Sequence, residues 1–458
     1  MSLRCVGDGL RVPLVNGGEV AYSNLDLAAS APALGSVADA VAEFLPWYSS
    51  VHRGAGFASM VATAAYKSAR SRVASFVGAR DADAVVFTRN TTEATNLLAW
   101  ALPDDTEVVA FATEHHANLL PWRRRELTVL PPPPTPHAAV EELERSLARR
   151  SGRRPRLVAV TGASNVTGEL WPLDDIVRVA HRFGARVVVD AAQLAPHRRI
   201  DMDAWDVDYL ALSGHKLYAP FGSGVLVGRG DWLQNGEPFL AGGGAVDFVT
   251  PSEVLWTELP ARQEAGSPNV VGAVALGMAC RTLTDAGMDR IAVEERVLLD
   301  RLLGGLDDIP AVQRYSMWGP GSARIGVVTF NLSGVPPGLL AAVLSAEYGI
   351  GVRHGCFCAH PLMVHLLRID GATVTSIQSQ FQNGHRPMLP GAVRASIGLP
   401  TQVEHVDRLL AAVREIAEKG HRWEYRAVPG TDDYVPAPDP RPRPAIAAVS
   451  PDLVRSGR

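Results

Sequence analysis

The middle of the chain alternates short apolar runs with longer helical patterns, and this alternation constrains the fold more than any other feature. Between about Arg80 and Gly230, runs rich in β-branched residues are separated by enough chain for a helix. This order is typical of βαβ units, which build a parallel sheet covered on both faces. The sequence therefore predicts a large α/β domain. Its expected strands are Ala84–Thr88, Glu107–Ala112, Arg156–Thr161, Arg186–Asp190, Tyr209–Ser213 and Gly224–Val227.

Helical spacing of apolar residues predicts the remaining elements. A chain of 458 residues exceeds the usual size of one hydrophobic core, so a second, smaller α+β unit is expected after the pattern changes near Ala261. We expect an N-terminal segment (1–30) packed on the small domain, a large domain (31–285), a small domain (286–425) and a Pro-rich, loosely attached tail (426–458). The expected helices are Ala138–Arg150, Leu173–Phe183, Val270–Ala286, Asp289–Leu306, Pro337–Tyr348 and Val403–Lys419, with a strand over Ile325–Asn331.

Composition favours a small-molecule enzyme over a nucleic-acid or membrane protein. The net charge of -4 is small for this length, hydrophobic residues make up 47%, and charged residues make up 20%. There is no apolar stretch of about 18 residues and no signal-peptide pattern at the start. Four cysteines are too few for a disulfide framework in a chain of this length. We therefore expect a cytoplasmic protein.

A carboxylate and a lysine stand at the ends of two successive expected strands. Asp190 ends the run Val187-Val-Val-Asp190, and Ser213-Gly-His215-Lys216 ends the next strand. Ligands of open α/β sheets bind at this edge, where a carboxylate can pair with a protonated pyridine nitrogen and a desolvated lysine can condense with an aldehyde. Either residue alone is more simply explained as part of a surface ion pair, but the two in this order favour a pyridoxal phosphate site.

A second segment suits a phosphate group. Thr88-Arg-Asn-Thr91-Thr92-Glu93-Ala94 follows an expected strand and opens a helix, where hydroxyls and backbone amides bind anions. The alternative is a simple helix cap with Glu93 in the first turn. Only the combination with Asp190 and Lys216 favours phosphate binding.

Taken together, the motifs resemble the fold-type I, class V aminotransferase family in order and spacing, from about Leu25 to Ile416. The segments that carry this resemblance are Asn24–Ala29, Val51–Gly54, Thr88–Ala94, Glu114–Asn118, Ser164–Gly168, Asp190–Gln193, Ser213–Lys216 and Arg262–Asn269.

The resemblance implies a role for each matching residue. Lys216 would bind pyridoxal 5'-phosphate covalently, His116 would stack on its ring, Asp190 would hold the ring nitrogen, and Gln193 would approach the phenolic oxygen. Ser267 would add a phosphate contact from a neighbouring subunit, which implies a homodimer. The other phosphate contacts would be Thr91, Thr92, Ser213 and His215, and the substrate contacts would be Asn165, Arg394, His52 and Arg353, with the Arg394 fork on the substrate carboxylate.

The segment Arg353-His-Gly355-Cys356-Phe-Cys358-Ala-His360 decides the expected reaction. A thiol near Arg and His on a Gly-flanked loop has the electropositive setting of a nucleophile. A buried cysteine pair or half of a metal site are the alternatives, and no metal is expected because Cys5 and Cys280 show no ligand spacing. The segment resembles the catalytic-cysteine loop of SUF-type cysteine desulfurases, with Cys358 as the persulfide-forming residue, and also that of molybdenum cofactor sulfurases. Cys356 is then a spectator or a resolving thiol.

The expected function is conversion of L-cysteine to L-alanine, with the sulfur passing through Cys358 to an acceptor, for which a protein is one candidate. The same scaffold also serves selenocysteine lyases, C–S lyases, aminotransferases and epimerases, and a non-catalytic sulfur carrier is the alternative of another class. One departure from the family is the long segment His365–Pro390 between Cys358 and Arg394, which we expect to be an added loop or lid.

Overall fold

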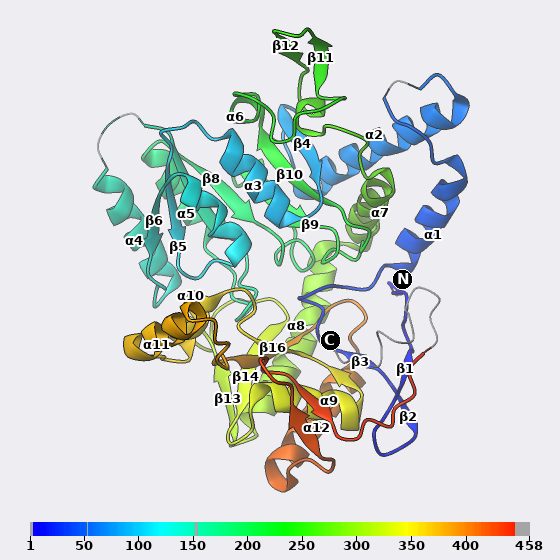
Figure 1. The fold of residues 1–458 in the computed structure, drawn as a ribbon, viewed down its shortest axis with the longest axis vertical. Coiled ribbons are helices and arrows are strands. Elements are labelled where there is room, and N and C mark those ends of the chain that lie inside the picture. Colours follow the sequence, from blue (N-terminus) through cyan, green and yellow to red (C-terminus); the bar gives the residue numbers. More distant parts are fainter. Residues whose placement is uncertain (1–2, 53, 151, 153, 445–458) are drawn as a thin grey trace.

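The protein has a large α/β domain above a smaller α+β domain in the view of Figure 1, which shows the computed structural model. The structure describes residues 3–52, 54–150, 152 and 154–444. Within these residues the large sheet has seven strands in the order β4-β10-β9-β8-β7-β5-β6. The strands are β4 (Asp83–Thr88), β5 (Glu107–Phe111), β6 (Glu126–Leu130), β7 (Arg156–Thr161), β8 (Ala185–Asp190), β9 (Tyr209–Ser213) and β10 (Gly224–Arg229).

The six predicted strands of this sheet are confirmed to within two residues at each end. Neighbouring strands from β9 to β6 are parallel, whereas β10 runs antiparallel to both β9 and β4. The edge strand β6 was not predicted, because its Glu126-Leu-Thr-Val-Leu130 sequence is short and begins with an exposed glutamate. The fold is therefore the expected mixed, mostly parallel sheet.

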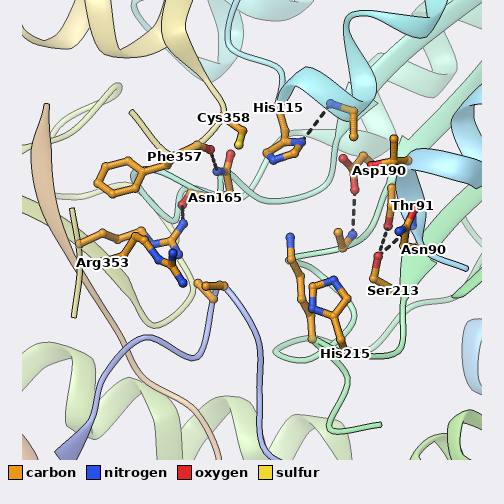
Figure 2. Close-up of a pocket in the computed structure, with 17 residues that line it drawn as sticks. Asn90, Thr91, His115, Asn165, Asp190, Ser213, His215, Arg353, Phe357 and Cys358 are labelled. Atoms are coloured by element: carbon orange, nitrogen blue, oxygen red, sulfur yellow. Dashed lines mark hydrogen bonds between the residues drawn. The ribbon is translucent and has the colours of Figure 1, made fainter. Parts of the chain in front are cut away.

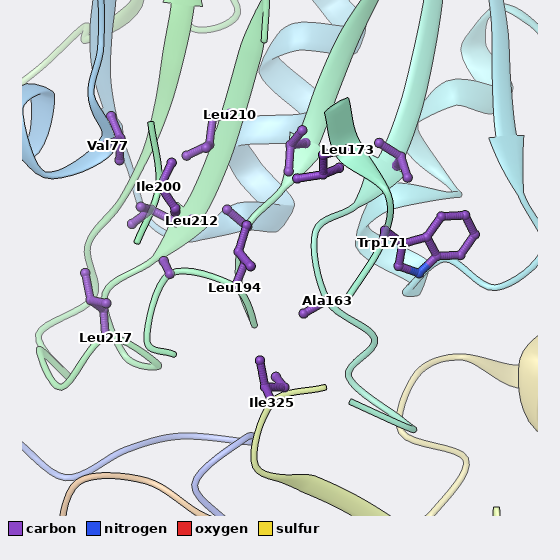
Figure 3. Packing of buried hydrophobic residues seen from close by; sticks show 14 of the residues in the cluster. Val77, Ala163, Trp171, Leu173, Leu194, Ile200, Leu210, Leu212, Leu217 and Ile325 are labelled. Atoms are coloured by element: carbon purple, nitrogen blue, oxygen red, sulfur yellow. The ribbon is translucent and has the colours of Figure 1, made fainter. Parts of the chain in front are cut away.

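Both faces of the large sheet are buried, as the near-continuous apolar runs of its strands require. Successive residues point to opposite faces, so that Tyr209 and Ala211 belong to one core and Leu210 and Leu212 to the other. Helix α3 (Thr91–Ala101) covers the first face. Figure 3 shows the second face, where Leu194 and Ile200 pack beneath the strands. The helices that contribute to this core are α2 (Phe57–Val77), α4 (Pro136–Ala148), α5 (Leu173–Arg182) and α7 (Val270–Ala286).

The small domain packs an antiparallel sheet against three helices, and their buried residues form a separate core. The sheet order is β13-β14-β17-β16. Its elements are β13 (Val312–Tyr315), β14 (Val327–Leu332), β16 (Arg353–Gly355), β17 (Ala392–Ser396), α8 (Met288–Asp307), α9 (Pro337–Tyr348) and α12 (Val403–Lys419). The helices predicted for this part of the chain are confirmed to within one residue, and the predicted strand Ile325–Asn331 corresponds to β14.

Short elements connect and extend the two domains. The N-terminal segment pairs with the small domain through β3 (Ser23–Asn24), which lies parallel to β15 (Ile350–Gly351). No helix of the described residues is both long and apolar enough to cross a membrane. The remaining elements are β1 (Arg11–Pro13), β2 (Glu19–Ala21), α1 (Gly35–Phe44), η1 (Leu45–Trp47), η2 (His116–Asn118), η3 (Pro121–Arg124), α6 (Gly230–Leu233), β11 (Val246–Val249), β12 (Val254–Trp256) and η4 (Ala261–Gln263).

The prediction of a loosely attached tail is wrong for residues 426–444. Strands β18 (Tyr425–Ala427) and β19 (Tyr434–Pro436) form a hairpin. The buried Glu347 carboxylate of α9 ties down the chain leading into it, because it accepts hydrogen bonds from the Tyr425 hydroxyl and from two backbone amides. The prediction rested on the shortage of large apolar residues in this segment. Hydrogen bonds to a buried carboxylate can hold a segment in place without such residues. Residues 445–458 lie outside the described part.

The loop of the C-terminal hairpin packs directly against helix α9 at Gly338. A Cβ atom at this position would lie 1.9 Å from the Asp432 carbonyl oxygen. We expect Gly338→Ala to lower the free energy of unfolding by about 1–3 kcal/mol, the usual cost of overpacking, and to make the hairpin more susceptible to protease. The matched control is Gly304→Ala in α8, where a Cβ would meet nothing within 4 Å. Urea unfolding and limited proteolysis measure both effects, and equal behaviour of the two variants would contradict this packing.

Candidate active site

Three strands of the large sheet bring their ends to one edge. Gly224 of β10 pairs with Ser213 on one side and with Thr88 on the other, and Asp190 pairs with Ala211. Because β4, β8 and β9 run in the same direction, the residues that follow them emerge together. Ligands of open α/β sheets bind at this edge.

A pocket of about 350 Å³ opens at this edge, between the two domains (Figure 2). This volume lies within the range of small-molecule sites. The residues that line it are Ala28, Ala29, Asn90, Thr91, Thr92, His115, Ala117, Asn165, Asp190, Ala192, Ser213, His215, Lys216, Arg353, Phe357, Cys358 and Arg394. Most of the predicted site residues are therefore brought together.

Asp190 and Lys216 form the electrostatic centre of the pocket. Burial raises the pKa of the Asp190 carboxyl, and the charge of Lys216 opposes this shift. Burial likewise lowers the pKa of the Lys216 amine, opposed by Asp190. Asp190 is further fixed by the Ala192 amide, which donates to its Oδ1 at 2.9 Å. The lysine is thus held where it can lose its proton more readily than an exposed lysine.

The N-terminus of α3 forms a cradle suited to an anion. The Thr91 backbone N–H donates to Ser213 Oγ at 2.8 Å, and the two hydroxyls lie 2.8 Å apart. The Asn90 side chain caps the helix by accepting from the Glu93 amide. Gly224 permits this approach, since a Cβ there would lie 2.7 Å from the Asn90 Cα atom. Hydroxyls and the positive end of a helix meet here, as phosphate binding requires.

The structure distinguishes the two adjacent histidines, of which the sequence favoured His116 for the site. His115 lines the pocket, whereas His116 is not among the lining residues and packs its ring 4.8 Å from that of His360. The His115 Nδ1 atom accepts from the Ala117 amide at 3.0 Å, which fixes the ring orientation. Burial, and then the charge of Lys216, lower the pKa of His115 to about 3, so its ring is neutral. The sequence offered two adjacent histidines, and only the turn of the chain into η2 decides which one faces the pocket.

Arg394 lies on β17 with its guanidinium buried beneath the pocket. Its Nη1 donates to the Asn165 carbonyl oxygen at 2.8 Å, and its guanidinium carbon lies 5.0 Å from the centre of the Phe357 ring. Burial lowers the pKa of Arg394 to about 10, although the neighbouring Asp26 partly offsets this. The arginine is nevertheless a cation at neutral pH, and it forms part of one wall of the pocket.

Asp26 is a residue of the site that sequence reasoning missed. Its Oδ2 atom lies 2.7 Å from Arg353 Nη2, and its Oδ1 atom lies 3.6 Å from Arg394 Nη2. A carboxylate between two arginines limits the repulsion between them and fixes their orientation. The motif Asn24-Leu-Asp26 contained the signal, but nothing in the sequence pointed to the arginines as its partners.

The two cysteines differ sharply in their surroundings. Cys358 lines the pocket and is exposed, whereas Cys356 is partly buried and its thiol donates to the Pro390 carbonyl oxygen at 3.2 Å. Burial, followed by the charge of Asp432, raises the pKa of Cys356 to about 11. A thiol that holds its proton so firmly is a weak nucleophile at neutral pH. This favours Cys356 as a spectator rather than a resolving thiol.

Besides His116, three predicted site residues do not line the pocket. Gln193 lies just behind the wall, where its Nε2 donates to the carbonyl oxygen of Ala28 at 2.7 Å. His52 is exposed and packs against the Tyr66 ring, and Ser267 is also exposed. The last two residues therefore contribute nothing to the pocket of their own chain.

The long segment after Cys358, which we expected to be an added loop or lid, contains helices. It forms α10 (His360–Leu366) and α11 (Gly371–Gln382). The Asp370 side chain caps α11 by accepting from the Thr373 amide at 2.8 Å. None of the residues of α11 is buried. The resemblance to the family showed that this segment is longer than usual but not that it is helical. Asp370, a typical residue for the start of a helix, was the sequence signal that we overlooked.

Comparison with known proteins gives one family. The family model described as Aminotransferase class-V matches residues 23–409. The chain is 37% identical over 414 residues to a cysteine desulfurase of Dickeya dadantii, which covers 88% of this chain and 93% of that protein. It is also 37% identical over 361 residues to a probable cysteine desulfurase of Halalkalibacterium halodurans, covering 76% of this chain and 86% of that protein.

Solved structures agree with these sequence relatives. The cysteine desulfurase CsdA from Escherichia coli superimposes with a TM-score of 0.73 at 31% identity, covering 87% of this chain and 95% of that one. The apo structure of a cysteine desulfurase from Thermococcus onnurineus superimposes with a TM-score of 0.75 at 31% identity, covering 91% and 99%.

The neutral His115 makes stability depend on pH. Because its folded-state pKa lies below the ordinary 6.5, its contribution is present above pH 6.5 and is lost as the pH falls toward 3. We expect the cofactor-free wild type to lose about 1–2 kcal/mol relative to His115→Gln between pH 7 and pH 5. Urea unfolding at the two pH values measures this difference. The exposed His385→Gln should follow the wild type, and a His115→Gln curve parallel to the wild type would refute the assignment.

Proposed function

Because the chain belongs to the aminotransferase class-V family, we propose that it is a pyridoxal-phosphate-dependent cysteine desulfurase that converts L-cysteine to L-alanine. One observation carries the proposal beyond the family. Cys358 lines the same pocket as Lys216. The thiol can therefore reach the sulfur of a bound cysteine while the amine reaches its α-carbon. A transaminase or an epimerase has no need of that thiol.

The residues of the pocket fit pyridoxal phosphate. The phosphate suits the cradle of Thr91, Thr92, Ser213 and His215, Asp190 suits the protonated ring nitrogen, and Lys216 suits the aldehyde. His115 takes the ring-stacking role that the sequence assigned to His116. The Gln193 Oε1 atom is buried without a hydrogen-bond partner among the described residues, which is consistent with a further polar group at this wall. When bound, the cofactor supplies a sink for the electrons of bonds broken at the substrate.

Substrate binding is assigned to the small-domain side of the pocket. The buried Arg394 offers its fork to the α-carboxylate of cysteine, and Asn165 and Arg353 line the same wall. Asp26 holds the two arginines in place. A carboxylate fixed at this end directs the rest of the amino acid toward Lys216 and Cys358.

Lys216 and Cys358 divide the chemistry between them. Lys216 Nζ takes the α-proton, a task eased by the burial that lowers its pKa. The Cys358 thiolate attacks the sulfur of the substrate: an S–S bond forms, the C–S bond breaks, and its electron pair stays with the carbon skeleton. Two protons complete alanine: the carbon that lost its sulfur takes the proton that the Cys358 thiol gave up on forming the thiolate, and Lys216 returns the other proton to the α-carbon. The sulfur remains on Cys358 as a persulfide.

A homodimer and a sulfur acceptor are further parts of the proposal. His52 and Ser267 are exposed and outside the pocket of their own chain, so they can serve the site of a second copy. Large apolar side chains near His52 in the sequence, Phe57 and Met60, are 70% and 60% exposed, which suits a protein interface. The exposure of Cys358 allows an acceptor, a protein or a small thiol, to reach its persulfide.

Cys358→Ser tests the reaction. We expect the variant to keep the absorbance of bound pyridoxal phosphate but to lose persulfide formation from L-cysteine, because a hydroxyl is a far weaker nucleophile toward sulfur. Mass spectrometry of the protein after incubation with cysteine locates the persulfide, and alanine is measured in parallel. Cys356→Ser is the matched control and should remain active. Full sulfur transfer by Cys358→Ser would contradict the role of this residue. Pyruvate and ammonia as products would instead indicate a lyase.

Arg394→Lys tests the substrate contact. Lysine keeps the charge but loses the fork, so we expect the KM for L-cysteine to rise about tenfold or more, in line with the loss of one charge-assisted hydrogen bond. Arg353→Lys should have a smaller effect, since half of its side chain is exposed. Steady-state kinetics decide the matter, and an unchanged KM in Arg394→Lys would remove this residue from the site.

A further inference from the structure

The backbone at Cys358 has an unusual conformation. Phe357 and Cys358 both have positive φ angles, 53° and 54°. This left-handed region is unfavourable for a residue other than glycine, so two such residues in succession persist only where surrounding contacts hold them. The thiol therefore sits on a turn that must be fastened from outside.

His116 holds this turn at two points, at Cys358 and just after it. Its backbone N–H donates to the Cys358 carbonyl oxygen at 2.8 Å, and its Nε2 atom accepts from the His360 backbone N–H at 3.3 Å. The rings of His116 and His360 lie 4.8 Å apart. One residue of the large domain thus fixes the C-terminal side of the turn that carries the cysteine. Asn165 adds a third contact, since its Nδ2 donates to the Phe357 carbonyl oxygen at 2.8 Å (Figure 2).

The segment that carries His116 is itself anchored. The Thr95 hydroxyl donates to the Ala117 carbonyl oxygen at 2.8 Å, and the buried Asn118 side chain donates to Glu114 Oε2 at 2.7 Å. The Trp122 indole donates to the Asn118 carbonyl oxygen. These bonds fix η2 to the large domain. A hydrogen bond from His116 to the turn therefore fixes the position of Cys358 relative to that domain.

The bond to His360 requires a lone pair on His116 Nε2, so the neutral ring carries its proton on Nδ1. Burial, and then the charge of His360, lower the pKa of His116 and keep the ring neutral. The titratable groups that face it are His360 and, with ring centres 6.3 Å apart, His115. Burial and the charge of His360 thus disfavour a positive charge on His116.

We propose that His116 is a positioning residue for sulfur transfer, which fixes the turn carrying Cys358 through the acceptor at its Nε2 atom. The proposal rests on the proposed desulfurase function and deepens it: the second histidine of the pair serves the cysteine, while the first serves the cofactor. The length of the His116 side chain matters, because only an acceptor at the Nε2 position lies within hydrogen-bond distance of the His360 backbone amide.

The test compares two amides of different length in the cofactor-loaded enzyme. The Gln side chain places an acceptor near the Nε2 position, whereas Asn ends near the Nδ1 position and cannot reach the His360 amide. We expect His116→Asn to slow single-turnover persulfide formation by about five- to tenfold, the value of one hydrogen bond, with KM changed less than about twofold. His116→Gln should restore most of the rate. His360→Ala keeps the backbone donor and should behave as the wild type.

A second readout does not depend on the reaction. Alkylation of Cys358 by iodoacetamide, located by mass spectrometry, should change several-fold in His116→Asn and return toward the wild-type rate in His116→Gln, while the absorbance of bound pyridoxal phosphate stays the same. Equal alkylation and persulfide rates in the Asn and Gln variants, or loss of bound cofactor in His116→Asn, would overturn the proposal. Absence of a persulfide in the wild type would refute the desulfurase function, and the alkylation rates would still decide the role of His116.

Discussion

The site depends on the hydrogen-bonded register of the large sheet. Because Gly224 pairs with both Ser213 and Thr88, and Asp190 with Ala211, the ends of three strands coincide at one edge. A shift of one residue would turn every side chain of a strand to the opposite face. Each strand packs against a buried core on both faces, and the fit of its side chains to the two cores opposes such a shift. The packing of the core therefore also sets the position of the lysine, the carboxylate and the anion cradle.

Burial gives these groups their chemistry. Asp190, Lys216, His115 and Arg394 are all removed from water, and in each case desolvation is the first cause of the pKa shift. Removal from water weakens the hold of each cation on its proton and strengthens each remaining charge pair. The small domain completes this environment, since Arg394 and the Cys358 turn come from it. The two domains thus divide the site: one holds the residues proposed to bind the cofactor, and the other brings the arginine proposed to bind the substrate carboxylate and the Cys358 thiol.

Much of the fold was predictable from local patterns, and several of the failures share a cause. Strands buried on both faces and helices with an apolar face carry strong signals, and the elements predicted from these signals have bounds within two residues of the observed ones, although α1 and α2 were not predicted. The edge strand β6, the exposed helix α11 and the C-terminal hairpin bury little apolar surface of their own. The hairpin is held by hydrogen bonds to Glu347, a residue 78 positions before Tyr425. Such a partner leaves no trace in a local pattern.

The sequence by itself determined the sheet, the edge at which Asp190 and Lys216 stand, and the presence of a cysteine near an arginine and a histidine, because periodicity and residue order encode these features directly. Only the tertiary structure decided which of two adjacent histidines faces the pocket, that Asp26 joins Arg353 and Arg394, and that Cys356 keeps its proton while Cys358 stands exposed. These distinctions depend on directions of side chains and on contacts between segments more than 200 residues apart, as for His116 and His360. Neither quantity is written in the order of the residues alone.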